Sequence, residues 1–203
     1  APAIVGLCEI ESKRTLFDLT RNAGLKNLGY RFSHFESPDA RGIDVALLYQ
    51  PDKFKPFVEQ AIKVEFPFAP ESKTRDILYV GGTTPSHDSL HIFVCHFPSR
   101  LGGEAESENR RVHVATVLRA SVDSILHTSP TANIIIMGDF NDYPDNNSML
   151  HTLKAAEFDG NLEKSTLYNL MFPHHRKGKG THKHAGEWGA LDQIIVSRNL
   201  LNT

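Results

Sequence analysis

The chain has 203 residues, of which 40% are hydrophobic and 23% charged, a composition typical of one soluble domain with its own core. Its 22 lysines and arginines against 24 acidic residues give a formal net charge of −2, which excludes a strongly basic nucleic-acid coat protein. No apolar run approaches the roughly 18–20 residues that span a bilayer, and none resembles a signal peptide. Cys8 and Cys95 cannot build a disulfide scaffold, and each lies in an apolar run typical of a core residue.

Short apolar runs, several of them with period-two alternation, predict most of the secondary structure as strands. In chain order the runs are Ile4–Cys8, Tyr30–Phe35, Ile43–Tyr49, Ala61–Phe66, Ile77–Thr83, Leu90–His96, Ile134–Met137 and Leu191–Val196. Spacings of three and four predict a helix after Ser12, a long helix over Glu104–His127 and a short helix over Asn146–Ala156.

The order of these elements predicts an α/β fold, because many strands follow one another through short turns with a few helices between them. Two facing sheets covered by helices bury long apolar strands on both faces. We therefore expect a four-layer sandwich of two mixed β-sheets flanked by helices. We expect it to form a single domain over residues 1–203 and to be a soluble monomer.

The clearest chemical signal is the motif Gly138-Asp139-Phe140-Asn141-Asp142, which directly follows the buried run Ile134–Met137. Residues i and i+2 of a strand point the same way, so we expect Asp139 and Asn141 side by side at the rim of a sheet. A carboxylate there can hold a divalent cation or a water, and an amide can donate to a phosphate oxygen. The same residues also fit an Asx-rich turn, so spacing alone leaves both interpretations open.

Other apolar runs are also bounded by ionisable residues. The first run is followed by Glu9 and Glu11, another ends in His96, and Asp192 opens the last predicted strand. Each of these has an ordinary explanation by itself, since a histidine at a strand end is commonly just solvated. If the strand ends lie side by side, however, they form one cleft of acids, an amide and an imidazole. Such acids repel one another without a cation, so the pattern predicts a metal.

Five segments, in this order, resemble the endonuclease/exonuclease/phosphatase superfamily, which includes deoxyribonuclease I, abasic-site endonucleases, neutral sphingomyelinases and inositol-polyphosphate phosphatases. They are Leu7–Glu11, Gly42–Tyr49, His96–Arg100, Gly138–Asp142 and Leu191–Ser197. The resemblance covers nearly the whole chain and implies a deoxyribonuclease I-like fold. The ordered set is specific to the superfamily but not to one substrate.

The resemblance implies a role for each matching residue. Glu9 matches the glutamate that binds the divalent metal, usually Mg²⁺ with Mn²⁺ as an alternative, and Glu11 is its common neighbour. His96 matches the catalytic histidine of deoxyribonuclease-like members. Asp139 and Asn141 match the pair that orients the attacking water and holds the phosphate.

Two further acids match the family less directly. Asp192 matches the aspartate that pairs with a second histidine near the C-terminus of family members. Asp44 lies near the position where some members place an acid behind the first histidine. An acid there would raise the pKa of His96, and a protonated His96 would stabilise the negative charge that develops on the phosphate. Mg²⁺ on Glu9 would supply Lewis acidity while Asp139 orients the water.

Two elements of the family pattern are absent from the sequence. No asparagine-containing strand precedes the Glu9 strand, and no Ser-Asp-His follows Asp192. We therefore expect a member that is incomplete at both ends, and we expect these 203 residues alone to hydrolyse phosphoesters poorly.

Substrate contacts are expected from a basic stretch, residues 174–184, which carries four cations, four histidines and no acid. It shortly precedes Trp188 and Asp192, so we expect it to overhang the cleft. Lys183 and Arg100 are the expected phosphate contacts, with Trp188 as a stacking platform.

Two other interpretations of this stretch remain open. A solvated glycine-rich loop explains the same composition. A zinc site on His182 and His184 is weaker, because two histidines at i and i+2 lack the further ligands that such a site needs.

These observations predict a divalent-metal-dependent phosphoester hydrolase, with a phosphodiesterase or nuclease favoured over a phosphatase or sphingomyelinase. Phe66-Pro67-Phe68 is the one candidate for the membrane-seeking loop that a sphingomyelinase needs. The alternative from another class is a non-catalytic phospholigand-binding module that keeps the fold without a complete site.

Overall fold

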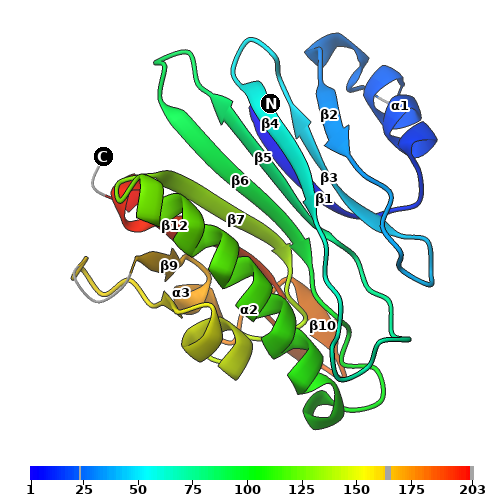
Figure 1. Cartoon of the computed structure of the whole chain (residues 1–203), viewed down its shortest axis with the longest axis vertical. Helices are drawn as coiled ribbons and strands as arrows, with labels where there is room; N and C mark the ends of the chain where they lie inside the picture. Colours follow the sequence, from blue (N-terminus) through cyan, green and yellow to red (C-terminus); the bar gives the residue numbers. More distant parts are fainter. Residues whose placement is uncertain (23, 163–165, 202–203) are drawn as a thin grey trace. The chain divides into compact units, whose positions relative to one another are not determined.

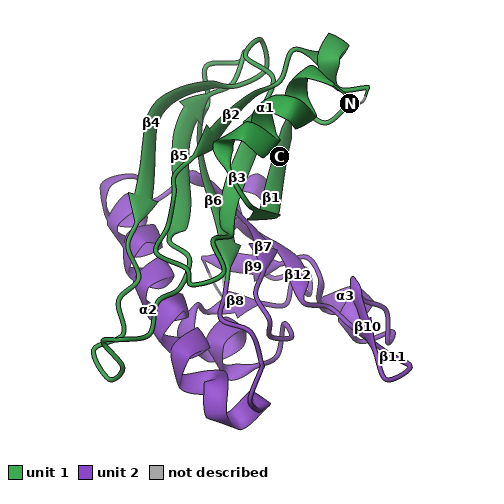
Figure 2. Ribbon diagram, turned by 90° about the vertical axis from the view of Figure 1, so that its right-hand side faces the viewer, with its two compact units in different colours: residues 1–96 green, residues 97–203 purple. Residues whose placement is uncertain are grey.

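The computed structural model describes residues 1–22, 24–162 and 166–201 (Figure 1). The chain forms two compact units, Ala1–His96 and Phe97–Thr203, which we call unit 1 and unit 2 (Figure 2). The expectation of a single domain over residues 1–203 stays a prediction.

Unit 1 contains strands of two sheets, and every pairing within the unit is antiparallel (Figure 1). The first sheet has the order β1-β3-β2, from β1 (Ile4–Ile10), β2 (Arg31–His34) and β3 (Asp44–Tyr49). The other strands are β4 (Lys55–Ile62), β5 (Ile77–Thr83) and β6 (Ser89–His96), each paired with the next. Every residue of β3 is buried, in keeping with its nearly continuous apolar sequence.

Helix α1 (Lys13–Arg21) covers one face of the first sheet. It begins after Ser12, whose hydroxyl accepts a hydrogen bond from the backbone N–H of Thr15 at 3.3 Å, as the capping pattern predicts. Leu16 is fully buried and packs in a cluster with residues of β1, of β3 and of the turn before β2. The members of that cluster are Ile10, Leu16, Tyr30, Ala46 and Leu48.

Unit 2 contains four strands in the order β7-β12-β9-β8, with a separate two-stranded hairpin. The strands are β7 (Asn133–Asp139), β8 (Ala155–Ala156), β9 (Leu167–Asn169) and β12 (Asp192–Ser197), and the hairpin is formed by β10 (His182–His184) and β11 (Glu187–Gly189). Strand β8 runs parallel to β9, and the other pairings are antiparallel.

Among the described residues of unit 2, the α-helices are α2 (Glu104–Thr128) and the short α3 (Phe172–His175), and a 3-10 helix spans Arg198–Leu201. Helix α2 packs against a π-helical turn at Asn147–Thr152, and Val114, Leu118 and Val122 are on its buried side. Among the helices that the structure describes, none combines the length and apolar character that crossing a bilayer requires.

Most of the strands agree with the sequence patterns, but Ala61–Phe66 does not. The strand at this place is β4 (Lys55–Ile62), which has no buried residue and carries the polar residues Lys55, Glu59 and Gln60. Val64 and Phe66 are buried although they lie in the following loop, and their burial explains the apolar pattern that suggested a strand. The prediction placed the strand about half its length too late because an edge strand carries little apolar signal.

The predicted helix over Asn146–Ala156 is a single π-helical turn, Asn147–Thr152. Met149 and Leu153 are both fully buried and four residues apart, which gives one turn a helical pattern. Lys154 has a φ of +60°, which ends the helix, and Ala155 then enters strand β8.

Both cysteines are free, as expected from their apolar surroundings. Cys95 is fully buried, and burial, with a smaller contribution from nearby Cys8, raises the pKa of its thiol well above the usual value. The Cys8 thiol lies 3.4 Å from the Cys95 carbonyl oxygen. Cys95 is therefore held as an unreactive thiol of the core.

Candidate active site

Asp139 ends β7, and Asn141 lies two residues later in a turn, so the strand alternation used in the prediction does not extend to Asn141. The Asp139 carboxylate accepts a hydrogen bond from the backbone N–H of Asn141 at 2.8 Å, which is an Asx turn. Asn141 has a φ of +49°, a conformation that is uncommon outside glycine. The two interpretations of the motif, a functional carboxylate–amide pair and an Asx turn, are therefore compatible. The turn itself orients the Asp139 carboxylate and the Asn141 residue.

Asn141 is held in place from two further sides. Its side-chain amide nitrogen donates to the Phe97 carbonyl oxygen at 3.0 Å, and its own carbonyl accepts from Arg100 Nε at 2.6 Å. An amide nitrogen carries two N–H groups, so the second remains for a ligand. The result is a preoriented amide donor in the turn that also holds the Asp139 carboxylate.

Arg100, an expected substrate contact, instead binds groups of the protein. Besides the Asn141 carbonyl, its guanidinium contacts Glu104 at 2.8 Å, Asn146 at 2.8 Å and Asp142 at 3.2 Å. With Nε and both terminal nitrogens occupied, the guanidinium positions the Asn141 loop. We therefore interpret Arg100 as a positioning residue.

Asp192 begins β12 directly opposite Asp139, because the two residues are Cα partners in the register. Paired residues point to the same face of a sheet, so two carboxylates adjoin here. Asp192 is exposed, and its backbone N–H donates to the Thr181 hydroxyl at 3.0 Å. Adjacent carboxylates favour a nearby cation or hydrogen-bond donor.

Part of the basic stretch forms the β10–β11 hairpin, at the edge of unit 2 (Figure 2). Lys183 pairs with Trp188 in the register, and its Nζ lies 5.6 Å from the indole ring centroid. Trp188 is 50% exposed, so a ring face remains open to solvent. His182 and His184 stack on the other face of their strand, with ring centroids 6.3 Å apart. Of the basic stretch, His182–His184 belong to the hairpin, so the interpretation as a glycine-rich loop does not describe these three residues.

In unit 1, Glu9 lies at the end of β1 where the register with β3 shifts between Leu7 and Ile10. It is exposed and has a φ of +59°. Among the described residues, non-glycine positive φ values occur at five positions, and two of them are the predicted site residues Glu9 and Asn141. Such strained backbone is often retained at functional sites. Glu11, also exposed, follows the strand end.

His96 is buried at the end of β6, and its carbonyl oxygen accepts a hydrogen bond from Arg75 Nε at 3.2 Å. Burial lowers the pKa of His96 to about 4, and the charges of Arg75 and Arg41 add to this, while Asp39 opposes it. The imidazole is therefore neutral at pH 7. The expected increase of this pKa is therefore wrong, and the role that a protonated His96 would have does not apply at pH 7, because desolvation disfavours the charged ring.

This low pKa gives a pH-dependent stability. The unfolded chain binds a proton on His96 near its ordinary pKa of 6.5, whereas the folded chain binds it only near 4. The contribution of His96 to the free energy of unfolding is therefore fully present above pH 6.5. The free energy of unfolding falls by about 3 kcal/mol as the pH drops to 4. We expect the free energy of unfolding of His96→Gln, measured by urea titration, to depend less on pH between 6.5 and 4 than that of the wild type. His151→Gln, at an exposed position, is the control, and an unchanged slope in His96→Gln would contradict the prediction.

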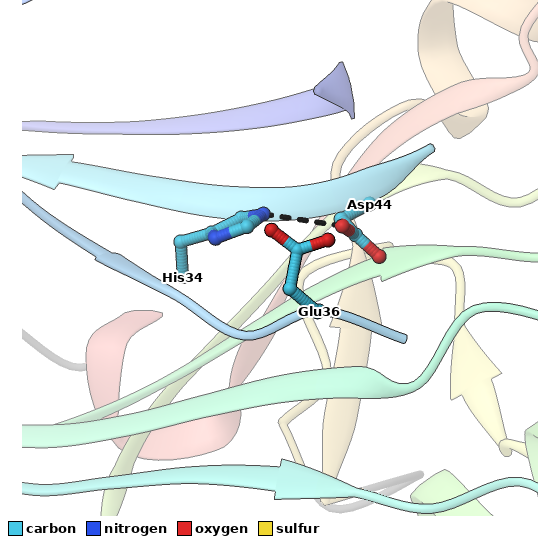
Figure 3. A group of neighbouring side chains, drawn as sticks. All are labelled: His34, Glu36 and Asp44. Atoms are coloured by element: carbon cyan, nitrogen blue, oxygen red, sulfur yellow. Dashed lines mark hydrogen bonds and ion pairs between the residues drawn. The ribbon is translucent and has the colours of Figure 1, made fainter. Parts of the chain in front are cut away.

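Asp44 contacts a different histidine from the expected one (Figure 3). Its Oδ2 lies 3.2 Å from Nε2 of His34, and its Oδ1 accepts from the backbone N–H of Ser37 at 2.9 Å and from the Ser37 hydroxyl. Among the described residues, His34 and Ser37 are its hydrogen-bond partners, so its placement behind His96 is not observed. The expected increase in the pKa of His96 is accordingly absent.

Glu9 fits a hard divalent cation such as Mg²⁺. Mg²⁺ commonly binds through one or two carboxylates, with water and substrate oxygens as the other ligands. Glu9 offers an exposed carboxylate on a constrained backbone, and the ligand atoms are oxygens. The donor type and its exposure therefore match Mg²⁺ or Mn²⁺.

Sequence reasoning missed several residues that support the site. Arg75 forms a buried ion pair with Asp39 at 2.8 Å, and it also holds the His96 main chain. Asp142 was given no role, yet it is buried and pairs with Arg111 at 2.8 Å. Arg75 and Asp39 are 36 residues apart, so no local pattern reveals their contact. The place of Asp142 in the motif Gly138–Asp142 is the one sequence signal that could have drawn attention to it.

The sequence matches the Endonuclease/Exonuclease/phosphatase family over residues 1–203, and the chain belongs to this family. The expected deoxyribonuclease I-like α/β fold is confirmed by this match and by solved structures. A comparison with the sequences of curated proteins finds no significant match.

Among similar solved structures, the catalytic domain of human Nocturnin has a TM-score of 0.69 and 20% identity, covering 97% of this chain and 69% of that one. ANGEL2, a 2',3'-cyclic phosphatase, in complex with adenosine-2',3'-vanadate has a TM-score of 0.70 and 13% identity, covering 96% and 70%. D. rerio TDP2 complexed with a single-strand DNA product has a TM-score of 0.60 and 16% identity, covering 97% and 71%. At these identities the likeness shows the fold.

Proposed function

We propose that the chain is a divalent-metal-dependent phosphodiesterase that acts on nucleic acid. Family membership supports hydrolysis of phosphoesters. The DNA product on TDP2 and the adenosine-2',3'-vanadate on ANGEL2 support a nucleic-acid phosphoester as the substrate class. The observation that carries the proposal is the end of β7, where Asp139 is fixed on the backbone of Asn141 and lies opposite Asp192.

Each residue then has a chemical task. The Asp139 carboxylate orients the attacking water by accepting a hydrogen bond from it. The second N–H of the Asn141 side-chain amide donates a hydrogen bond to a phosphate oxygen. Glu9 would hold the divalent ion, which supplies Lewis acidity to the phosphate when bound. The Asp192 carboxylate, opposite Asp139 in the register, would accept a hydrogen bond from a donor group that binds beside the two carboxylates. Asp44 acts at a distance, through His34 and Ser37, as a positioning residue.

His96 acts as a neutral imidazole at pH 7, because its pKa is about 4. A neutral ring donates one hydrogen bond and accepts another, so it can position a phosphate oxygen or a water without adding positive charge. Charge stabilisation therefore depends on the metal and on fixed donors such as the Asn141 amide.

The hairpin supports nucleic acid as the substrate class. An exposed indole ring stacks on bases of any sequence, and Lys183 adds a positive charge directly beside it. We propose that Trp188 and Lys183 contact a single-stranded segment of the substrate. This arrangement carries no base-specific donor pattern, so we expect little sequence preference.

Replacing Glu9 with glutamine tests the metal. We expect the affinity for Mg²⁺, measured by calorimetry, to fall at least about tenfold, since the substitution removes the charged ligand. The melting temperature without metal should not change, because the side chain is exposed. Glu71→Gln, an exposed glutamate of the same unit, is the matched control. Unchanged affinity in Glu9→Gln would remove Glu9 from the metal site.

A substrate panel tests the reaction. Single-stranded and plasmid DNA, an abasic duplex, sphingomyelin and inositol phosphates are each incubated with Mg²⁺ and with chelator. We expect turnover of nucleic acid with Mg²⁺ and none with chelator. Turnover of sphingomyelin or inositol phosphates alone would contradict the substrate class. Binding without turnover of any substrate would indicate a phospholigand-binding module.

A further inference from the structure

A second cluster of ligand-type side chains lies in unit 1, in addition to Glu9. His34 ends β2, Asp44 begins β3, and Glu36 lies in the loop between them (Figure 3). One ligand atom from each of the three residues lies within 4.8 Å of the other two. The side chains of His34 and Asp44 are 2% and 3% exposed, so the pair is shielded from water.

The distance within the buried pair suits a shared ion. Nε2 of His34 and Oδ2 of Asp44 are 3.2 Å apart. Two ligands of a tetrahedral Zn²⁺, each bonded at about 2.0–2.1 Å, are separated by roughly 3.3 Å. The second carboxylate oxygen of Asp44 is already held by Ser37, which fixes the orientation of the carboxylate as outer-shell partners do around metals.

Glu36 supplies a third ligand that no protein group uses. Its carboxylate points toward the His34–Asp44 pair (Figure 3), and it has no hydrogen-bond or ion-pair partner among the described residues. Two carboxylates so close to each other repel unless a cation lies between them.

An ion can reach the cluster from solvent. Glu36 and Ser37 line a cavity of about 750 Å³ in unit 1, whose far wall is formed by the segment 63–76. Asp76 lines the same cavity. A metal site needs an entry path as well as ligands, and this cavity provides one.

We propose that His34, Glu36 and Asp44 bind a divalent transition-metal ion, with Zn²⁺ as the best match. An imidazole nitrogen with two carboxylates suits Zn²⁺, whereas Mg²⁺ requires oxygen ligands in octahedral geometry. Three protein ligands would leave a further coordination position for water or a phosphate oxygen, and of the three ligands Glu36 lines the cavity. Glu9 is not one of these three ligands, although its neighbour Ile10 pairs with Asp44 in the register, and binding of the ion can be measured without any phosphodiesterase activity.

The ion would brace the loop that joins β2 to β3. That loop carries Asp39, which pairs with Arg75, and Arg75 holds the main chain of His96. A bound ion would link the ends of the two strands and reduce the mobility of this loop. We expect bound Zn²⁺ to increase the melting temperature of the protein.

The test is a calorimetric titration of the whole chain with Zn²⁺ in the presence of millimolar Mg²⁺. We expect one equivalent to bind in the wild type and in Glu9→Gln. We expect the affinity to fall at least about tenfold in Glu36→Gln and in His34→Gln. Glu36 is exposed, so Glu36→Gln keeps the test valid if His34→Gln fails to fold. The Zn²⁺-dependent increase in melting temperature should disappear in the same variants.

The double substitution His182→Ala and His184→Ala separates this site from the exposed histidines of the hairpin. Zn²⁺ binding that survives in this variant supports the proposal. Binding that is lost there and kept in Glu36→Gln would overturn it, as would no Zn²⁺ uptake by the wild type. In that last case His34 and Asp44 form a hydrogen-bonded pair and nothing more. Loss of Zn²⁺ in Glu9→Gln with retention in Glu36→Gln would also overturn it.

Discussion

Replacing Asp139 with asparagine is expected to lower the turnover number on a phosphodiester by about 10²–10³, with substrate affinity much less affected. Asparagine is nearly isosteric and its side-chain oxygen can still accept the hydrogen bond from the Asn141 N–H, so the turn stays intact. What is lost is the negative charge that orients and polarises the attacking water. Initial rates with Mg²⁺ and melting curves, measured on the same preparations, check this expectation.

The control for Asp139→Asn is Asp145→Asn. Asp145 lies in the same acidic segment, is 57% exposed, and pairs with His175 at 3.2 Å. It should keep full turnover, because its carboxylate contacts a surface histidine. Retained turnover in Asp139→Asn would mean that the motif serves only as an Asx turn.

Replacing Asp142 with alanine should destabilise the fold by about 3–5 kcal/mol, because it leaves a buried cation without its partner. The Asp142 carboxylate is 2% exposed and contacts Arg111 Nε at 2.8 Å, Arg100 at 3.2 Å and the Ser148 hydroxyl at 2.5 Å. Arg111 is fully buried and has no access to solvent that would replace the lost charge. For a chain of this length the melting temperature should fall by more than about 6 °C.

Asp123→Ala is the matched control for Asp142→Ala. Asp123 also pairs with an arginine, Arg119, but it is 55% exposed and the pair lies along the surface of α2. Exposed pairs of this kind contribute about 1 kcal/mol or less. A loss of stability in Asp142→Ala as small as that in Asp123→Ala would contradict the prediction. It would mean that the Arg111 guanidinium finds other partners in the variant.

The strands and the local part of the site follow from the sequence. The apolar runs predict β3, β5, β6, β7 and β12 to within a few residues. Asp139 and Asn141 meet through a local turn after the end of β7, which the alternative interpretation as an Asx turn describes and strand alternation does not. Glu9 could be placed at a strand end because the end of an apolar run is also a local feature. In each case the atoms that matter are within a few residues of one another.

The chemistry of His96 could not be predicted in this way. The motif identified the residue, but its pKa depends on burial and on Arg75, Arg41 and Asp39, which are distant in the sequence. The sequence-based expectation of a charged ring assumed a nearby acid and neglected desolvation. Burial of the imidazole reverses the sign of the pKa shift.

Two contacts show the same limit. Asp44 was matched to the neighbourhood of His96, but β2 and β3 pair so that Asp44 contacts His34. Arg100 was expected to bind substrate, but the fold surrounds its guanidinium with Asn141, Asp142 and Asn146. In both cases the sequence indicated that the residue is important but did not predict which group it contacts. Strand register and loop packing determine that partner.

The sequence by itself determined the family, the strand-rich α/β class and the identity of the acids at the strand ends, because these depend on residue order and on periodicity over a few residues. The tertiary structure alone decided which histidine each acid contacts, the neutral state of His96 and the cluster of His34, Glu36 and Asp44. These features depend on contacts between residues distant in the sequence and on the exclusion of water. Neither long-range contacts nor the exclusion of water can be predicted from the local pattern of apolar and polar residues.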